Sequence, residues 1–184
     1  PLVPSPRPWR VLSSRPALDD PWFRVRRDTV ELPDGTVVED YSVAERKDFA
    51  LVAAVTGADE LVLVRQWKQG IGEITLELPG GIVDEGDAHD AAARELLEET
   101  GYVCGELRLV GGGALDPSKE TTRAHLFAGT GARRVAEQEL DVTEEIEVVL
   151  VPVGELRERI RAGEITAPTS VAGIYLALDA LGRL

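Results

Sequence analysis

Three glutamates near the middle of the chain have a spacing that could hold a divalent metal ion. The segment 88–100 around them contains neither glycine nor proline, Asp87 is a suitable helix N-cap, and Gly101 stands where a C-cap glycine is expected. The segment therefore predicts a helix, and at about 100° per residue the three carboxylates share one of its faces. Oxygen ligands of this kind suit Mg²⁺ or Mn²⁺, ions that commonly bridge carboxylates to substrate phosphates. These residues are Glu95, Glu98 and Glu99.

Neighbouring residues would position these carboxylates. Pro79-Gly80-Gly81 precedes the helix, and its glycines allow the backbone to come close to a ligand or a metal. An apolar stripe on nearly the opposite helix face could anchor the helix on a sheet. That stripe consists of Ala93, Leu96, Leu97 and Thr100. The alternative explanation for the glutamates is a solvated acidic face with Arg94 as a partial counter-ion.

The segment 94–102, RELLEETGY, matches the core of the Nudix box, REUxEExGU, so the chain resembles the Nudix hydrolase family. The whole box, Gx5Ex7REUxEExGU, aligns in two ways. A start at Gly80 places Gly86 at the first glutamate of the box, whereas a start at Gly81 places Asp87 there and leaves one residue fewer before Arg94. We prefer the second alignment, because Asp87 keeps a carboxylate at the helix start, where the helix dipole favours negative charge.

The resemblance implies metal-dependent hydrolysis of a nucleoside diphosphate linked to another group, with Mg²⁺ or Mn²⁺ as the cofactor. In this reaction water attacks a phosphorus of the diphosphate in line with the leaving phosphate oxygen. The family assigns Glu95 and Glu99 as principal metal ligands, with Glu98 and the Gly80 carbonyl as further ligands. Arg94 would orient the glutamates through salt bridges.

Segments on both sides of the box are similar to the ADP-ribose pyrophosphatase subgroup. Residues 61–68, LVLVRQWK, resemble its LVxQYR strand, and residues 77–81, ELPGG, resemble its ELPAG. The two segments 116–119 and 123–127 resemble its SPGFTDERIHLF, and Pro117 lies 15 residues beyond the box, near the place of the subgroup's marker proline. The resemblance therefore implies ADP-ribose as the substrate, with AMP and ribose 5-phosphate as products.

In the same subgroup a mobile acidic loop before the last strand supplies the catalytic base. Residues 137–145 of this chain, called the acidic loop below, correspond to it, with Glu144 as the best match and Glu145 as the second. The alternative is a solubilising acidic turn. The resemblance also suggests substrate contacts through aromatic, basic and proline side chains. These are Trp22, Trp67, Arg46, Arg65, Lys68 and Pro117.

Two other functions stay open at this point. A related enzyme of the same family could prefer GDP-mannose, another nucleotide sugar or a dinucleotide. A Nudix-like module could instead sense a nucleotide without catalysis, although the intact REUxEE core weighs against that alternative.

The composition of the chain excludes several classes of binding partner. The 184 residues carry a net charge of −13, which argues against binding a nucleic acid polymer through its phosphates. No run of 18 apolar residues is present, so no membrane span is expected. The single cysteine, Cys104, excludes an internal disulfide, and a cytoplasmic location is the default expectation.

Residues 1–45 are expected to form an N-terminal arm and β-hairpin, ahead of a Nudix domain at residues 46–184. The strand-like runs 23–32 and 36–44 flank Pro33-Asp34-Gly35, and Asp-Gly between two such runs is a strong hairpin signal. In the sugar-nucleotide branches of the family a comparable N-terminal sheet helps to form a dimer, so a symmetric homodimer is expected.

The remaining elements predict an α/β/α sandwich with a mixed sheet, which is the Nudix fold. The runs 49–56 and 61–67 are rich in aliphatic residues, as strands covered on both faces require. A strand is expected at 103–110, and the three glycines at 111–113 would begin a long loop. Helices are expected near 153–162 and 170–182, so strands lie on either side of the central helix in sequence.

Overall fold

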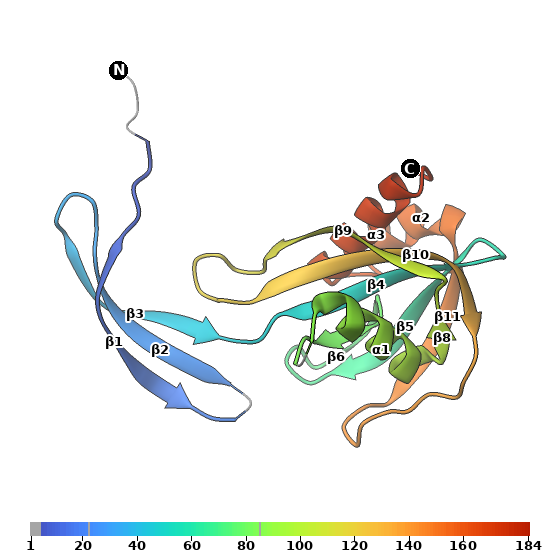
Figure 1. The fold of residues 1–184 in the computed structure, drawn as a ribbon, viewed down its shortest axis with the longest axis horizontal. Helices are drawn as coiled ribbons and strands as arrows, with labels where there is room; N and C mark the ends of the chain where they lie inside the picture. The colour runs from blue at the N-terminus through green and yellow to red at the C-terminus, as the bar shows by residue number, and fades with distance from the viewer. Residues whose placement is uncertain (1–4, 22, 85) are drawn as a thin grey trace. The chain divides into compact units, whose positions relative to one another are not determined.

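The computed structural model describes residues 5–21, 23–84 and 86–184, and the chain divides into two compact units (Figure 1). Unit 1 combines Pro1–Lys47 with Ala114–Thr122. Unit 2 combines Asp48–Gly113 with Arg123–Leu184. The segment 114–122 thus interrupts unit 2 in sequence and packs with the N-terminal residues.

The described part of unit 1 folds into a three-stranded antiparallel sheet in the order β1-β2-β3. Its strands are β1 (Arg10–Asp19), β2 (Arg24–Glu31) and β3 (Val37–Glu45). The predicted hairpin is confirmed: the Thr36 N–H donates to Asp34 Oδ1 at 2.9 Å, and Gly35 has a φ of 89°, which favours glycine. The 114–122 segment joins this sheet through β3, because the Ala44 N–H donates to the Lys119 carbonyl at 2.7 Å.

Unit 2 is built, within the described residues, on an eight-stranded mixed sheet. The main path is β11-β5-β4-β10-β8, with β6 beside β5, β7 beside β4 and β9 beside β10. Strand β10 runs parallel to β4, whereas β5 is antiparallel to both β4 and β11. The strands are β4 (Phe49–Thr56), β5 (Glu60–Lys68), β6 (Glu73–Glu77), β7 (Gly80–Ile82), β8 (Tyr102–Val103), β9 (Glu106–Ala114), β10 (Arg123–Arg134) and β11 (Ile146–Pro152).

Helices cover both faces of this sheet (Figure 1). Alternate residues of β4 point to opposite faces: Ala50, Val52 and Ala54 join one buried cluster with α1, and Leu51, Ala53 and Val55 join another with α2 and α3. The expected α/β/α sandwich with a mixed sheet is therefore confirmed. The helical elements are α1 (Ala88–Thr100), η1 (Val153–Glu155), α2 (Leu156–Arg161) and α3 (Pro168–Ala180).

The three consecutive glycines lie inside a strand, so the predicted long loop at this position is wrong. They belong to β9, which pairs with β10. A Cβ on Gly112 would stand 2.3 Å from the Ala124 carbonyl oxygen, and a Cβ on Gly111 would stand 2.6 Å from Leu176 Cδ1 on α3. Close packing therefore accounts for Gly111, which faces α3, and for Gly112, which faces the backbone of β10, whereas an added Cβ on Gly113 would meet no atom within 4 Å.

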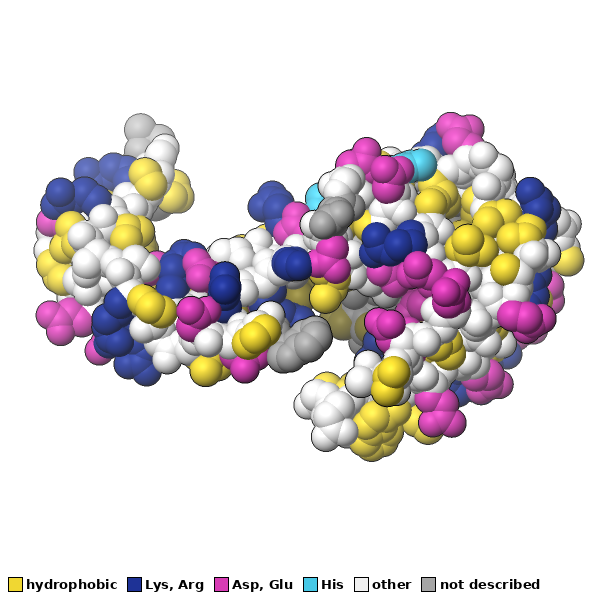
Figure 2. All heavy atoms as spheres, turned by 60° about the horizontal axis from the view of Figure 1, so that its bottom comes forward, with side chains coloured by type: hydrophobic (Ala, Val, Ile, Leu, Met, Phe, Trp, Pro, Cys, Tyr) yellow, Lys and Arg dark blue, Asp and Glu magenta, His cyan; other side chains and the backbone are white. Residues whose placement is uncertain are grey.

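The negative charge of the chain is concentrated in unit 2. Unit 1 has nine basic and ten acidic residues, whereas unit 2 has 11 basic and 23 acidic residues and a net charge of −12. Figure 2 shows acidic side chains, in magenta, across the visible face of unit 2. Among the described residues, no helix has the length and apolar character needed to cross a membrane.

Candidate active site

Helix α1 is capped at both ends and anchored along one side. Asp87 Oδ1 accepts a hydrogen bond from the Asp90 N–H at 2.9 Å, and Gly101, with a φ of 74°, donates to the Leu97 carbonyl at 2.7 Å. Leu96 is buried against the sheet. Leu97 was predicted to belong to the same anchoring stripe, but it is 36% exposed, because the buried face is centred on Ala92 and Leu96.

Glu99 projects from this anchored face into the glycine segment. Its side chain is only 4% exposed, and its Oε2 accepts the Gly80 N–H at 2.7 Å. Burial, with the negative charges of Glu95 and Glu144, raises the pKa of Glu99 to about 8 despite the opposing effect of the Gly80 hydrogen bond. The site therefore holds a buried carboxyl group that has a high affinity for a cation, either a proton or a metal ion.

Arg94 fixes the other two glutamates of the helix. Its Nη2 donates to Glu95 Oε1 at 2.7 Å and to the Ile82 carbonyl at 3.2 Å, and its Nε lies 3.5 Å from Glu98 Oε2. The hydrogen bond to Glu95 raises the pKa of Arg94, so the guanidinium stays charged. The structure thus gives Arg94 the orienting contacts that the sequence resemblance implied.

The glycine pair before the helix is required by packing. A Cβ on Gly81 would lie 2.3 Å from Glu95 Cδ, and a Cβ on Gly80 would lie 2.1 Å from the Ala50 carbonyl oxygen. Any larger residue would push the segment away from β4 or displace the Glu95 carboxylate. Gly80 was expected to offer its carbonyl to a metal; the contact that the structure shows is made by its N–H.

Strand β5 brings one predicted substrate contact to the carboxylates. Lys68 Nζ lies 2.5 Å from Glu77 Oε1, which also accepts Gln66 Nε2 at 3.0 Å, and the positive charge of Lys68 acts on Glu99. Gln66 was not singled out from the sequence, although its two-residue spacing from Lys68 places both on one strand face. Arg65 and Trp67 alternate with these residues along β5 and therefore point to the opposite face of the strand. Arg65 pairs with Glu147 at 2.7 Å, and Trp67 is 54% exposed.

The acidic loop approaches the helix carboxylates. The negative charge of Glu144 contributes to the raised pKa of Glu99, so the two side chains interact electrostatically. Glu144 Oε2 accepts the Asp141 N–H at 3.0 Å, which holds the side chain within a tight turn of the loop. Glu145 is exposed.

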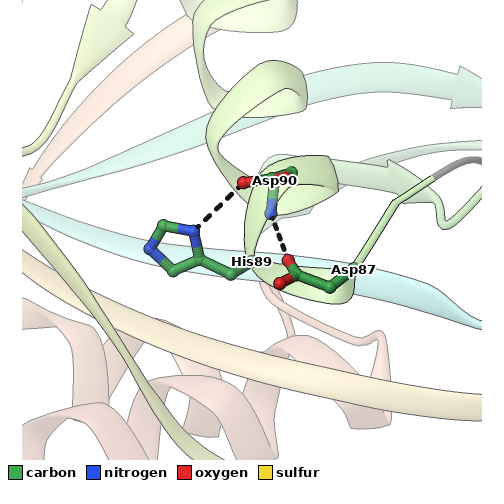
Figure 3. A group of neighbouring side chains, drawn as sticks. All are labelled: Asp87, His89 and Asp90. Carbon is green, nitrogen blue, oxygen red and sulfur yellow. Dashed lines mark hydrogen bonds and ion pairs between the residues drawn. The ribbon is translucent and has the colours of Figure 1, made fainter.

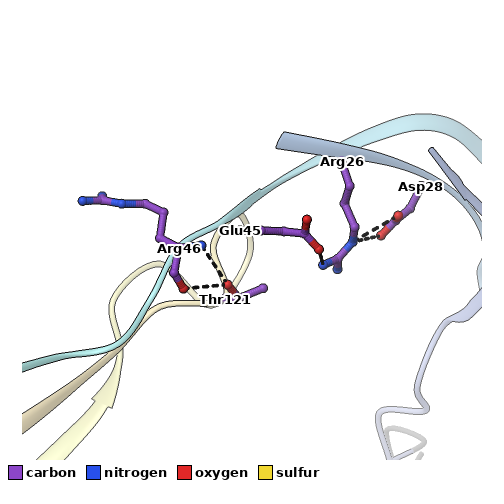
Figure 4. Close-up of polar contacts among 5 residues, drawn as sticks. All are labelled: Arg26, Asp28, Glu45, Arg46 and Thr121. Carbon is purple, nitrogen blue, oxygen red and sulfur yellow. Dashed lines mark hydrogen bonds and ion pairs between the residues drawn. The ribbon is translucent and has the colours of Figure 1, made fainter. Parts of the chain in front are cut away.

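Two further predicted contacts belong to unit 1. The Arg46 backbone N–H and carbonyl both bond to Thr121 Oγ1 at 3.2 Å (Figure 4). The Arg46 guanidinium lies 3.8 Å from Glu120. Pro117 is exposed in the 114–122 segment. Trp22 lies outside the described residues. Of the predicted substrate contacts, the structure therefore brings Lys68 together with the carboxylates.

A second group of possible metal ligands lies at the start of α1. Asp87, His89 and Asp90 have ligand atoms within 4.8 Å of one another, and all three residues are exposed (Figure 3). His89 Nδ1 lies 3.6 Å from Asp90 Oδ1, whereas Asp87 is already engaged as the helix cap. The positive end of the helix dipole disfavours a cation here, so this group is a poorer candidate than the glutamates.

Comparisons with known proteins show which sequences and structures this chain is similar to. Residues 46–169 match the family model for the NUDIX domain, and residues 9–44 match the model for the nucleoside diphosphate sugar hydrolase N-terminal domain. The chain is 28% identical to an ADP-ribose pyrophosphatase of Bacillus subtilis, covering 82% of this chain and 83% of that protein. It is 30% identical to a GDP-mannose pyrophosphatase of Klebsiella pneumoniae, covering 80% and 81%. A crystal structure of an ADP compounds hydrolase shares the fold, with a TM-score of 0.87 at 20% identity over 99% of this chain and 100% of that one.

The raised pKa of Glu99 predicts a pH-dependent stability in metal-free protein. The unfolded chain ionises this carboxyl near pH 4.5, but the folded chain keeps its proton until about pH 8. The folded state therefore binds more protons in this range, and the free energy of unfolding should fall as the pH rises from 4.5 to 8. At about 1.4 kcal/mol per pKa unit the loss is at most about 5 kcal/mol.

Urea unfolding in EDTA at pH 5 and pH 8 measures this effect. Glu99→Gln should flatten the pH dependence, whereas the control Glu106→Gln, at an exposed position on β9, should leave it unchanged. An equal pH dependence in wild type and Glu99→Gln would contradict the assignment.

Proposed function

Since the chain belongs to the NUDIX family, we propose that it hydrolyses the diphosphate bond of a nucleoside diphosphate linked to another group, with ADP-ribose as the substrate. The products are AMP and ribose 5-phosphate. The observation that carries this proposal is the carboxylate cluster of α1, in which the buried Glu99 is hydrogen-bonded to Gly80 and Glu95 is held by Arg94.

The cluster fits a divalent cation. Its donors are hard oxygens, and the buried Glu99 carboxyl, with its raised pKa, retains a proton that a cation would replace. We assign Glu95, Glu98, Glu99 and the Gly80 carbonyl as ligands for Mg²⁺ or Mn²⁺. When bound, the cation would neutralise charge on the diphosphate and acidify the attacking water. Unit 2 has a net charge of −12, so an anionic substrate depends on such a local positive charge.

Other side chains of the site have separate proposed roles in the reaction. Arg94 keeps the Glu95 carboxylate oriented, and Lys68 is placed to contact a phosphate oxygen. Glu144 accepts the proton of the water that attacks phosphorus in line with the leaving oxygen. The Asp141 N–H donates to Glu144 Oε2, and Oε1 of the same carboxylate can accept the proton. Glu145 is the second candidate for the base.

Substrate choice rests on the residues outside the box. The subgroup-like segment around Pro117 supports ADP-ribose, and we propose Arg46, Arg65, Trp67 and Pro117 as substrate contacts; Trp22 remains a candidate from the sequence. GDP-mannose is the second candidate. Thr122 replaces the glutamate, and Ser118 the glycine, of the segment on which the ADP-ribose assignment depends.

A substrate panel tests this proposal. With Mg²⁺ or Mn²⁺ and product identification, ADP-ribose should be hydrolysed faster than GDP-mannose or ADP-glucose, and EDTA should abolish activity. Glu95→Gln and Glu99→Gln should each lower turnover at least about 100-fold, and Glu106→Gln should not. A rate with ADP-ribose no higher than that with GDP-mannose would refute the substrate assignment.

The identity of the base has its own test. Glu144→Gln should lower kcat roughly 10²–10⁴-fold while metal and substrate affinity stay nearly unchanged, since the amide keeps the shape but accepts no proton. Steady-state kinetics and metal titration separate these quantities. If Glu145→Gln alone produces this pattern, Glu145 is the base and the assignment of Glu144 is wrong.

We also propose that unit 1 forms a symmetric homodimer. Every residue of β1 is exposed, and a three-stranded sheet with uncovered apolar side chains on this strand is expected to pack against a partner. Light scattering at micromolar concentration should show a dimer. Val11→Asp should shift it toward monomer, whereas Leu109→Asp, at an exposed site on β9, should not. A fully active wild-type monomer would contradict the proposal.

A further inference from the structure

The acidic loop is fastened at its root to the end of helix α1 by one side chain. Gln138 Nε2 donates to the Glu99 carbonyl at 2.7 Å and to the Ile146 carbonyl at 3.0 Å, so both hydrogens of the amide are used. The Glu99 carbonyl is one of the last four of the helix, which have no partner within it. Gln138 itself is half-buried.

Neighbouring backbone groups complete this attachment. The Glu139 N–H donates to the Glu98 carbonyl at 2.9 Å, and the Val135 N–H donates to the Gly101 carbonyl at 2.8 Å. The carbonyls of Glu98, Glu99 and the C-cap Gly101 thus accept hydrogen bonds from residues 135–139. Glu98 and Glu99 therefore offer their side chains to the proposed metal and their carbonyls to the loop that carries the proposed base.

The second hydrogen bond of Gln138 closes the loop on itself. It joins residue 138 to the carbonyl of Ile146, where β11 begins, and Glu144 lies only two residues before that point. Closing a chain segment at both ends restricts the positions that its interior can reach. One amide therefore fixes both ends of the segment that contains Glu144, and one of its two acceptors is the backbone of Glu99.

We propose that Gln138 is a positioning residue for the hydrolysis: its amide sets the register between the acidic loop and α1, so that Glu144 reaches the attacking water. Gln138 acts through the backbone and contacts neither substrate nor metal. The inference rests on the proposed function, since it assumes the reaction in which Glu144 accepts a proton.

Gln138→Met tests the inference, because methionine has nearly the same length and volume but donates no hydrogen bond. We expect kcat for ADP-ribose to fall about 10–100-fold, with KM and the Mg²⁺ activation midpoint within about twofold of wild type. Amide hydrogen exchange should increase at Glu139 and within the loop. In a Glu144→Gln background the same substitution should change kcat less than about twofold, because the group that it positions is already gone.

Two further variants sharpen the test. Val142→Ala, at a fully exposed position of the same loop, should keep wild-type kcat, and Gln138→Lys, which retains donors of similar reach, should recover most of it. Three results would overturn the inference. The first is an unchanged kcat in Gln138→Met, and the second is an equal loss of kcat in the wild-type and Glu144→Gln backgrounds. The third is a rise in KM that accounts for the whole loss of kcat/KM. Failure of the proposed function looks different, because the wild-type protein would then leave ADP-ribose and GDP-mannose intact before any variant is compared.

Discussion

The hydrogen bond from the Gly80 N–H to the buried Glu99 carboxylate links the two segments that the site depends on. One partner belongs to a helix anchored on the sheet, and the other belongs to β7, which pairs with β4. A carboxyl removed from water needs either a proton, a donor or a cation, and this one accepts a backbone hydrogen bond from Gly80 at 2.7 Å. Burying this carboxyl is unfavourable, and a metal ion bound by it would offset that cost. The glycines beside it allow the two segments to approach each other closely.

Much of this arrangement could be predicted from local sequence. The helix with its Asp87 and Gly101 caps, the Asp-Gly hairpin and the doubly covered strand β4 all follow from short-range rules that the structure obeys. The placement of Leu97 did not follow, because a helical wheel shows which residues share a face but not where the sheet meets that face. The glycines at 111–113 were misassigned for a related reason: Gly111 and Gly112 are required by the approach of Leu176 and Ala124, which come close to them only once the chain has folded.

The contacts that position the candidate site were harder to predict than the residues proposed to perform its chemistry. Glutamates on one helix face have a recognisable spacing, whereas Gln138 is an ordinary polar residue until the fold places Glu99 and Ile146 within reach of its amide. Gln66 is similar, since its role appears only when β6 brings Glu77 beside it. A motif indicates which residues carry the proposed chemistry, whereas hydrogen bonds that form only in the folded chain determine where those residues lie.

The unequal division of charge between the two units affects how quickly the protein meets its substrate. A nucleoside diphosphate compound is an anion, and it approaches a unit whose net charge is −12. Repulsion over a Debye length of about 8 Å at physiological ionic strength slows diffusional encounter. Added salt screens this repulsion, so the association rate should rise with ionic strength, opposite to the behaviour of enzymes whose surface field attracts the ligand. The proposed metal ion would then also contribute to selectivity, because an anion would be held only where the local positive charge outweighs the field of the whole unit.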